Sequence, residues 1–164
     1  MDISACKNQR RNKLLAPSLK QVFCAVRRQW VAATPEELVR QRLLLKLTQQ
    51  LGYPSGHVAV EVSLQQMPHL REKPPLLRRA DIICYAPTFH PLLLIECKAV
   101  PLNARVLRQA MGYNRYVQAH YVVVANEGEE RIGRFDDATG EYQFTSGIPE
   151  YTKLKEFNAK TQSR

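Results

Sequence analysis

The stretch RRADIICYAPTFHPLLLIECKA, residues 78–99, decides the fold, because it reads as two buried strands joined by a short turn. Both halves are rich in large apolar residues, and turn-forming residues lie between them at positions 88–90. Positions equally far from such a turn oppose one another, so the regions of Asp81 and Glu96 are expected to be neighbours. Strand alternation then puts Glu96 and Lys98 on one face.

Two acids beside each other at the end of a hydrophobic strand point to a bound cation. Neighbouring carboxylates repel unless a cation or a proton lies between them, and hard oxygen ligands suit Mg²⁺ or Mn²⁺. An ion held by Asp81 and Glu96 could polarise a phosphodiester, while Lys98 orients the attacking water or offsets growing charge. The alternative interpretation is a solvated strand end with a surface Glu–Lys pair, a pattern that is common by chance.

A helix is predicted for TPEELVRQRLLLKLTQQLG, residues 34–52. Thr34 can cap it, Pro35 suits its first position, and Glu37 can act as the capping-box partner of Thr34. Apolar residues recur every four positions from Val39, which predicts a face directed at a core. Gly52 is expected to end the helix.

The remaining patterns predict an α/β fold. Strands are predicted at residues 57–64 and 121–126, a helix from Asn103 to about residue 118, and a C-terminal hairpin at residues 131–145 around the turn DDATG. Three prolines make residues 65–77 a loop. The order αβββαβ plus a C-terminal hairpin predicts a central mixed sheet flanked by helices.

Composition indicates one globular domain with an affinity for polyanions. The chain of 164 residues carries a net charge of +9, and residues 1–33 hold seven Lys or Arg against a single Asp. Such a bias favours nucleic acid as partner. We expect a basic leader at residues 1–21, a domain at residues 22–151 and a polar tail at residues 152–164.

Several classes of protein are disfavoured. The four cysteines show no CxxC spacing and follow no apolar signal segment, which predicts free thiols and a cytoplasmic location. No apolar run approaches the roughly 18 residues of a membrane span, so no membrane association is expected. The four histidines lack zinc-finger spacing. No phosphate loop of the form GxxxxGK[ST] occurs, so neither ATP binding nor a complete restriction subunit is expected.

Four stretches in order, TPEELVRQ, RRADIICY, LLLIECKA and RQAMGYN, resemble the N-terminal nuclease domain of the type I restriction enzyme motor subunit, in its stand-alone form. That domain belongs to the PD-(D/E)XK superfamily, and the resemblance runs from about Val22 to Tyr151. It implies a restriction-endonuclease-like core and metal-dependent hydrolysis of nucleic acid, with DNA preferred over RNA as the expected substrate. Ala80 stands where the superfamily has proline.

The resemblance also implies roles for individual residues. Asp81 matches the first metal-binding acid, Glu96 and Lys98 match the E-x-K pair, and the backbone carbonyl of Cys97 is an additional metal ligand. A glutamate on the first helix completes such sites, and Glu37 is preferred to its neighbour Glu36.

The second helix is similar to the element that supports the lysine and the substrate phosphate. Gln109 and Tyr113 match its Q-x-x-x-Y motif and share one helical face. Arg105, Arg108 and Arg115 would add positive charge near the scissile phosphate.

Two questions stay open at this level. A non-catalytic module that binds nucleic acid or a protein partner would share these features. The presence of both acids and the lysine argues against loss of the catalytic activity. A homodimer would suit a small enzyme that cuts two strands, but no residue in the sequence requires one.

Overall fold

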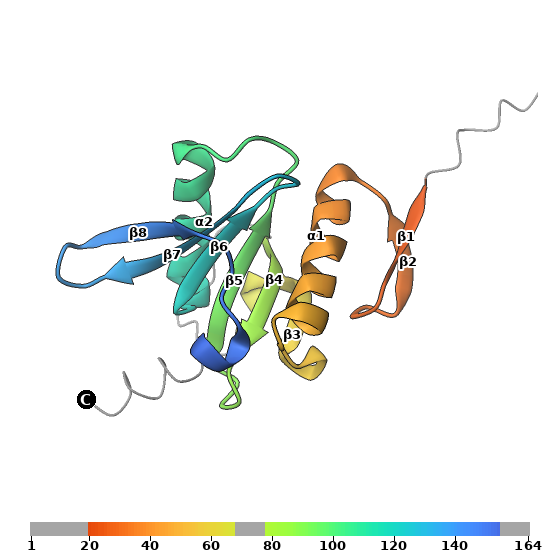
Figure 1. The fold of residues 1–164 in the computed structure, drawn as a ribbon, viewed down its shortest axis with the longest axis horizontal. Coiled ribbons are helices and arrows are strands. Elements are labelled where there is room, and N and C mark those ends of the chain that lie inside the picture. Colours follow the sequence, from red (N-terminus) through yellow and green to blue (C-terminus); the bar gives the residue numbers. More distant parts are fainter. Residues whose placement is uncertain (1–19, 68–77, 155–164) are drawn as a thin grey trace, which may run out of the picture.

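The computed structural model describes residues 20–67 and 78–154, and Figure 1 shows their arrangement. The elements are β1 (Gln21–Cys24), β2 (Gln29–Ala32), α1 (Pro35–Leu45), β3 (Val58–Ser63), β4 (Arg79–Tyr85), β5 (Pro91–Cys97), α2 (Ala104–Val117), β6 (Tyr121–Ala125), β7 (Glu130–Asp136) and β8 (Glu141–Ser146). A π-helical turn (Lys46–Gln50) extends α1, and 3-10 turns (Ser55–His57 and Leu64–Gln66) flank β3. From α1 onward, the order of helices and strands that the sequence predicts is confirmed.

Six strands form a mixed sheet in the order β3-β4-β5-β6-β7-β8. All neighbours are antiparallel except β5 and β6, which are parallel and are joined through helix α2. A parallel pair needs such a crossover, because the chain must return to the starting end of the sheet. The architecture is consistent with the restriction-endonuclease-like core that the resemblance implies.

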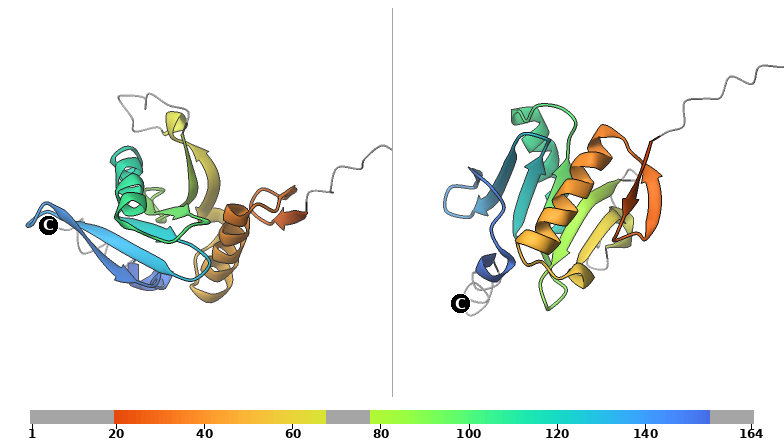
Figure 2. Two further views of the ribbon diagram at one scale, coloured as in Figure 1. Left: turned by 90° about the horizontal axis from the view of Figure 1, so that it is seen from above. Right: turned by 45° about the vertical axis from the view of Figure 1, so that its right-hand side comes forward.

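The core lies on both faces of the sheet, and Figure 2 shows the helices on opposite sides of it. Ile95 and Val123 pack in the same cluster as Leu43 of α1, whereas Val122 packs with Val106 of α2. Every residue of β5 is buried. A strand covered on both faces is apolar without alternation, which explains the run of leucines before Glu96.

Helix α1 begins as predicted. Thr34 Oγ1 accepts a hydrogen bond from the backbone N–H of Glu37 at 3.1 Å, and Pro35 occupies the first turn. Gly52, with φ of +72°, follows the π-helical turn and lets the chain reverse. The carboxylate of Glu37 is buried in the protein. The side chain of Glu37 therefore does not adopt the capping-box geometry that the sequence predicts.

The described structure departs from the sequence-based expectation at both ends. Strands β1 and β2 form a separate hairpin that the patterns did not predict, and β1 begins at Gln21, the last residue assigned to the leader. Residues 151–154 form a helical turn whose Tyr151 and Leu154 are buried, so packing continues into the predicted tail. Leader residues 1–19, loop residues 68–77 and tail residues 155–164 lie outside the described residues.

Three cysteines, Cys24, Cys84 and Cys97, are buried free thiols, as expected, and Cys6 lies outside the described residues. Burial raises the pKa of both Cys84 and Cys97, which makes these two thiols poor nucleophiles. Within residues 20–67 and 78–154, neither helix combines the length and the apolar character that crossing a membrane requires.

Candidate active site

Asp81 and Glu96 come together because β4 and β5 pair as neighbouring antiparallel strands. Ile82 lies opposite Ile95, and Asp81 and Glu96 occupy the next position of each strand. Asp81 Oδ2 accepts a hydrogen bond from the backbone N–H of Cys97 at 2.7 Å, which ties the carboxylate to the neighbouring strand. Two rigid central strands therefore hold both acids, with less freedom than a loop would allow.

Lys98 follows directly after β5. Its backbone N–H donates to the carbonyl of Ala125 at 2.9 Å, so the chain stays beside β6 for one residue beyond the strand. The ammonium Nζ lies 3.5 Å from Glu96 Oε2, and the lysine side chain is 17% exposed. The structure thus places Lys98 beside Glu96 on one face, as alternation predicts.

Glu96 is buried with incomplete compensation of its charge. The residue is 3% exposed, and among the described residues its Oε1 atom has no hydrogen-bond partner. Burial, followed by the neighbouring charge of Asp81, raises the pKa of Glu96 to about 8, although Lys98 opposes the rise. A buried carboxyl in this state favours either a proton or an additional cation.

Arg40 of α1 supplies the central positive charge of this region, and sequence reasoning missed it. Its Nη1 lies 2.5 Å from Glu37 Oε2, and its Nη2 lies 2.5 Å from Asp81 Oδ1 and 2.6 Å from Glu61 Oε1. Burial opposes the charge, but the carboxylates of Asp81, Glu61 and Glu37 outweigh it and raise the pKa of Arg40. One feature of the sequence points to Arg40. It directly follows Val39, which is buried, and it lies within one helical turn of Glu37.

Glu61 is the second missed residue, and its backbone is unusual. The β3–β4 register pairs Val60 with Ile82 and Val62 with Ala80, but the ladder omits Glu61, which comes opposite Asp81. Glu61 has φ of +53°, a left-handed conformation that is rare for a residue with a side chain and costs free energy. An ion pair with Arg40 joins the Glu61 side chain to the acid cluster.

Glu37, rather than Glu36, belongs to the buried cluster. Glu37 is 6% exposed, accepts a hydrogen bond from Gln41 Nε2 at 2.7 Å and pairs with Arg27 of the β1–β2 turn, whereas Glu36 is exposed. Glu37 is linked to Asp81 through Arg40. No group of three His, Cys, Asp or Glu side chains within the described ranges is spaced to hold a metal ion, so the site offers two strand acids rather than a complete cage.

Of the predicted residues of α2, Gln109 is exposed, whereas Tyr113 is half-buried and packs against a core cluster. Gln109 Nε2 donates to the hydroxyl of Tyr113 at 3.4 Å, and the guanidinium of Arg78 lies over the Tyr113 ring at 5.1 Å. All three arginines of the helix, Arg105, Arg108 and Arg115, are exposed. Gln109 is thus bonded to Tyr113, and its role toward Lys98 or the substrate phosphate stays a prediction.

A cleft of about 720 Å³ opens beside Lys98. Helix α1, the segment after β5 and the segment between β6 and β7 line it, including Pro35, Leu38, Arg42, Lys98, Val100 and Glu127. Lys98 reaches this cleft, whereas Asp81 and Glu96 do not line it. Lys98 thus contacts Glu96 through its ammonium and is also one of the residues that line the cleft.

A family model matches the part of the chain that contains the sequence motifs. Residues 35–149 match the model of the family described as type I restriction enzyme R protein N terminus (HSDR_N). A solved fragment assigned to the HsdR subunit of a type I restriction enzyme from Vibrio vulnificus YJ016 is similar over 73% of this chain, with 19% identity and a TM-score of 0.49. The chain spans 24% of that protein's chain. No curated protein matches the sequence.

Proposed function

The chain belongs to the family of type I restriction enzyme R protein N termini, and from this premise we propose that it is a metal-dependent nuclease that hydrolyses phosphodiester bonds of DNA. The observation that carries the proposal is the geometry of Asp81, Glu96 and Lys98. Two paired central strands hold the acids, and the ammonium lies 3.5 Å from Glu96. A surface Glu–Lys pair, the alternative explanation, does not fit a glutamate that is 3% exposed.

The residues present fit a divalent cation. Asp81 and Glu96 are its proposed ligands, together with the backbone carbonyl of Cys97 and, less directly, Glu37. Glu96 Oε1, which has no hydrogen-bond partner in the described part of the chain, and the raised pKa of Glu96 both support a site that is short of positive charge. When bound, Mg²⁺ or Mn²⁺ would stabilise negative charge on the phosphodiester and lower the pKa of a water molecule.

Lys98 is the proposed link between the acids and the substrate. Its ammonium lies beside Glu96 and the residue also lines the cleft, so it would hold a water molecule or offset charge on a phosphate oxygen. Gln109 and Tyr113 would contact the substrate phosphate from α2. The exposed Arg105, Arg108 and Arg115 would attract the DNA backbone.

Cleavage assays test this proposal directly. Single-stranded, duplex and branched DNA, and RNA, would be incubated with Mg²⁺, Mn²⁺ or EDTA. Asp81→Asn, Glu96→Gln and Lys98→Ala are each expected to reduce cleavage at least about 100-fold, with the fold checked by circular dichroism. Lys153→Ala is the matched control, because Lys153 is 71% exposed and its ion pair with Glu150, at 3.8 Å, lies on the surface.

One observation favours a second function, a module that binds nucleic acid without cutting it. Arg40 already neutralises Asp81 at Oδ1, so an internal cation takes part of the charge that a metal would take. Affinity for DNA in EDTA, combined with no cleavage of any substrate in either metal, would favour this second function. Metal-dependent cleavage that disappears in Asp81→Asn would exclude it.

A further inference from the structure

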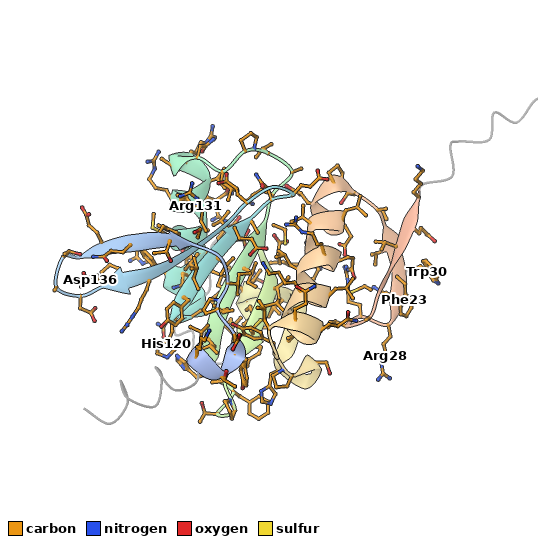
Figure 3. The ribbon with its side chains drawn as sticks, viewed as in Figure 1. Phe23, Arg28, Trp30, His120, Arg131 and Asp136 are labelled. Atoms are coloured by element: carbon orange, nitrogen blue, oxygen red, sulfur yellow. The ribbon has the colours of Figure 1, made fainter. Side chains whose placement is uncertain are left out.

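The β1–β2 hairpin presents two aromatic rings to solvent. Phe23 and Trp30 are direct cross-strand partners, and their rings meet edge to face with centroids 5.5 Å apart. Phe23 is 47% exposed and Trp30 is 64% exposed. Figure 3 shows the pair on the side of the hairpin that is turned away from α1.

The other face of the hairpin is fixed to the protein. Cys24 is fully buried, and Val26 and Val31 pack against the core cluster that includes α1. Arg27, in the turn, pairs with Glu37 of the acid cluster. The outer face of an antiparallel pair is usually polar when the inner face packs on a core. The hairpin is therefore a fixed platform. The packing of the hairpin on the core does not require aromatic residues on its outer face.

The surroundings of the rings are basic and polar. Residues 20–33 contain Lys20, Arg27 and Arg28 and no acid, and the whole chain carries a net charge of +9. Gln21, which shares the face of Phe23 by strand alternation, is exposed. A wide apolar patch would suit a protein partner, whereas two rings among amides and cations suit the bases and phosphates of a polynucleotide.

We propose that the outer face of the β1–β2 hairpin binds single-stranded nucleic acid, with bases stacked on Trp30 and Phe23. Lys20 and Arg28 would contact the phosphates on either side. A single strand is the expected ligand, because duplex bases already stack on one another and expose only their edges. The inference deepens the proposed function, on which it rests for the class of substrate, by adding a second contact outside the acid cluster.

The β7–β8 hairpin provides a comparison within the same molecule. Phe135 and Tyr142 are also cross-strand partners with rings edge to face, 5.4 Å between centroids, and Phe135 is 44% exposed. Its tip carries Asp136, Asp137 and Glu141, which repel phosphates. Figure 3 shows Asp136 at the end of the molecule opposite Trp30. Charge thus selects the β1–β2 pair over an otherwise similar one.

Trp30 is the single tryptophan of the chain, so its fluorescence reports on the proposed site alone. Titration of the full chain in EDTA with an oligodeoxythymidylate is expected to quench the emission to saturation, more weakly at high salt. Phe23→Leu keeps the reporter and is expected to weaken binding about tenfold, the size typical of one lost base–aromatic stack. Phe135→Leu, the matched control, is expected to bind like the wild type.

Two further ligands separate stacking from charge. A duplex of the same length is expected to quench less than the single strand, and inorganic polyphosphate, which has no rings, is expected to cause no quenching. Equal quenching by polyphosphate, or fluorescence anisotropy of a labelled oligonucleotide that shows binding with unchanged Trp30 emission, overturns the inference. Absence of any nucleic-acid binding overturns it as well.

The outcome is independent of the nuclease assay. Cleavage without a change in Trp30 emission would support the proposed nuclease function and contradict the proposed binding of single strands by the β1–β2 hairpin. Quenching by single strands without cleavage in any metal would support binding by the β1–β2 hairpin and contradict the proposed nuclease function.

Discussion

The guanidinium Nη2 of Arg40, on α1, lies 2.5 Å from Oδ1 of Asp81 in β4. The same guanidinium reaches Glu37 and Glu61, so one buried cation joins the first helix to two strands of the sheet. Such a group balances the acids when no other cation is bound. It also fixes α1 against the strands that carry the proposed active site.

Arg40→Met is expected to destabilise the protein by about 3–5 kcal/mol, because it leaves buried carboxylates without their partner. Urea unfolding in EDTA measures the effect. Arg131→Met serves as the control, since Arg131 is 50% exposed and its pair with Glu129, at 3.3 Å, lies on the surface. Its effect is expected to stay within about 0.5 kcal/mol. Equal losses in the two variants would contradict a central role for Arg40.

Mg²⁺ is expected to raise the melting temperature of Arg40→Met more than that of the wild type. The carboxylates freed by the substitution bind a cation that the native arginine otherwise competes with, and binding to the folded state stabilises it. Thermal unfolding at increasing Mg²⁺ concentrations, with Ca²⁺ in parallel, measures the shift. An identical shift in both proteins would show that Arg40 and the metal do not compete.

Glu96 is expected to make the metal-free protein less stable as pH rises. Its pKa lies near 8 in the folded protein against 4.5 for an ordinary glutamate, so the folded state holds this proton more tightly than the unfolded state. The resulting contribution to stability is complete below pH 4.5 and is lost as pH rises toward and through about 8. The difference in unfolding free energy between wild type and Glu96→Gln in EDTA measures it, and a difference independent of pH would contradict the assignment.

The arginines of α2 are expected to contribute affinity without sequence preference. Replacing Arg105, Arg108 and Arg115 by glutamine should weaken binding of DNA in EDTA and reduce the slope of log affinity against log salt by roughly 0.7–0.9 per lost phosphate contact. Anisotropy titrations at several salt concentrations provide both values. Lys153→Gln, at a lysine that is 71% exposed in the C-terminal helical turn, is the control, and an unchanged slope in the triple variant would place the DNA elsewhere.

Two glycines are expected to respond to alanine in opposite directions. Gly112 lies inside α2 with open space around its position, so Gly112→Ala should stabilise the protein by about 1 kcal/mol. A Cβ at Gly133 would lie 2.5 Å from Cε1 of Phe144, its cross-strand partner, so Gly133→Ala should destabilise by roughly 1–3 kcal/mol. Urea unfolding of the two variants checks the signs.

Local patterns in the sequence were enough for the main elements and for the proposed catalytic pair. Thr34 and Asn103 mark the two helix starts, because capping is a contact between residues two or three positions apart. The approach of Asp81 to Glu96 followed from a short turn and strand alternation, which also act over short range. The β1–β2 hairpin escaped prediction because its runs are only four residues long and lie within a basic segment.

Tertiary structure alone decided how the charges of the site are balanced. Arg40 and Asp81 are 41 positions apart in the chain, and no periodicity links them. Glu61 joins this cluster from a left-handed backbone conformation, which the residue types around it do not predict. Strand and helix patterns arise from neighbours along the chain, whereas the compensation of a buried charge depends on which distant elements meet within a few ångströms. The sequence by itself therefore determined that Asp81 and Glu96 lie on neighbouring strands, and tertiary packing determined that Arg40 is the cation that pairs with Asp81.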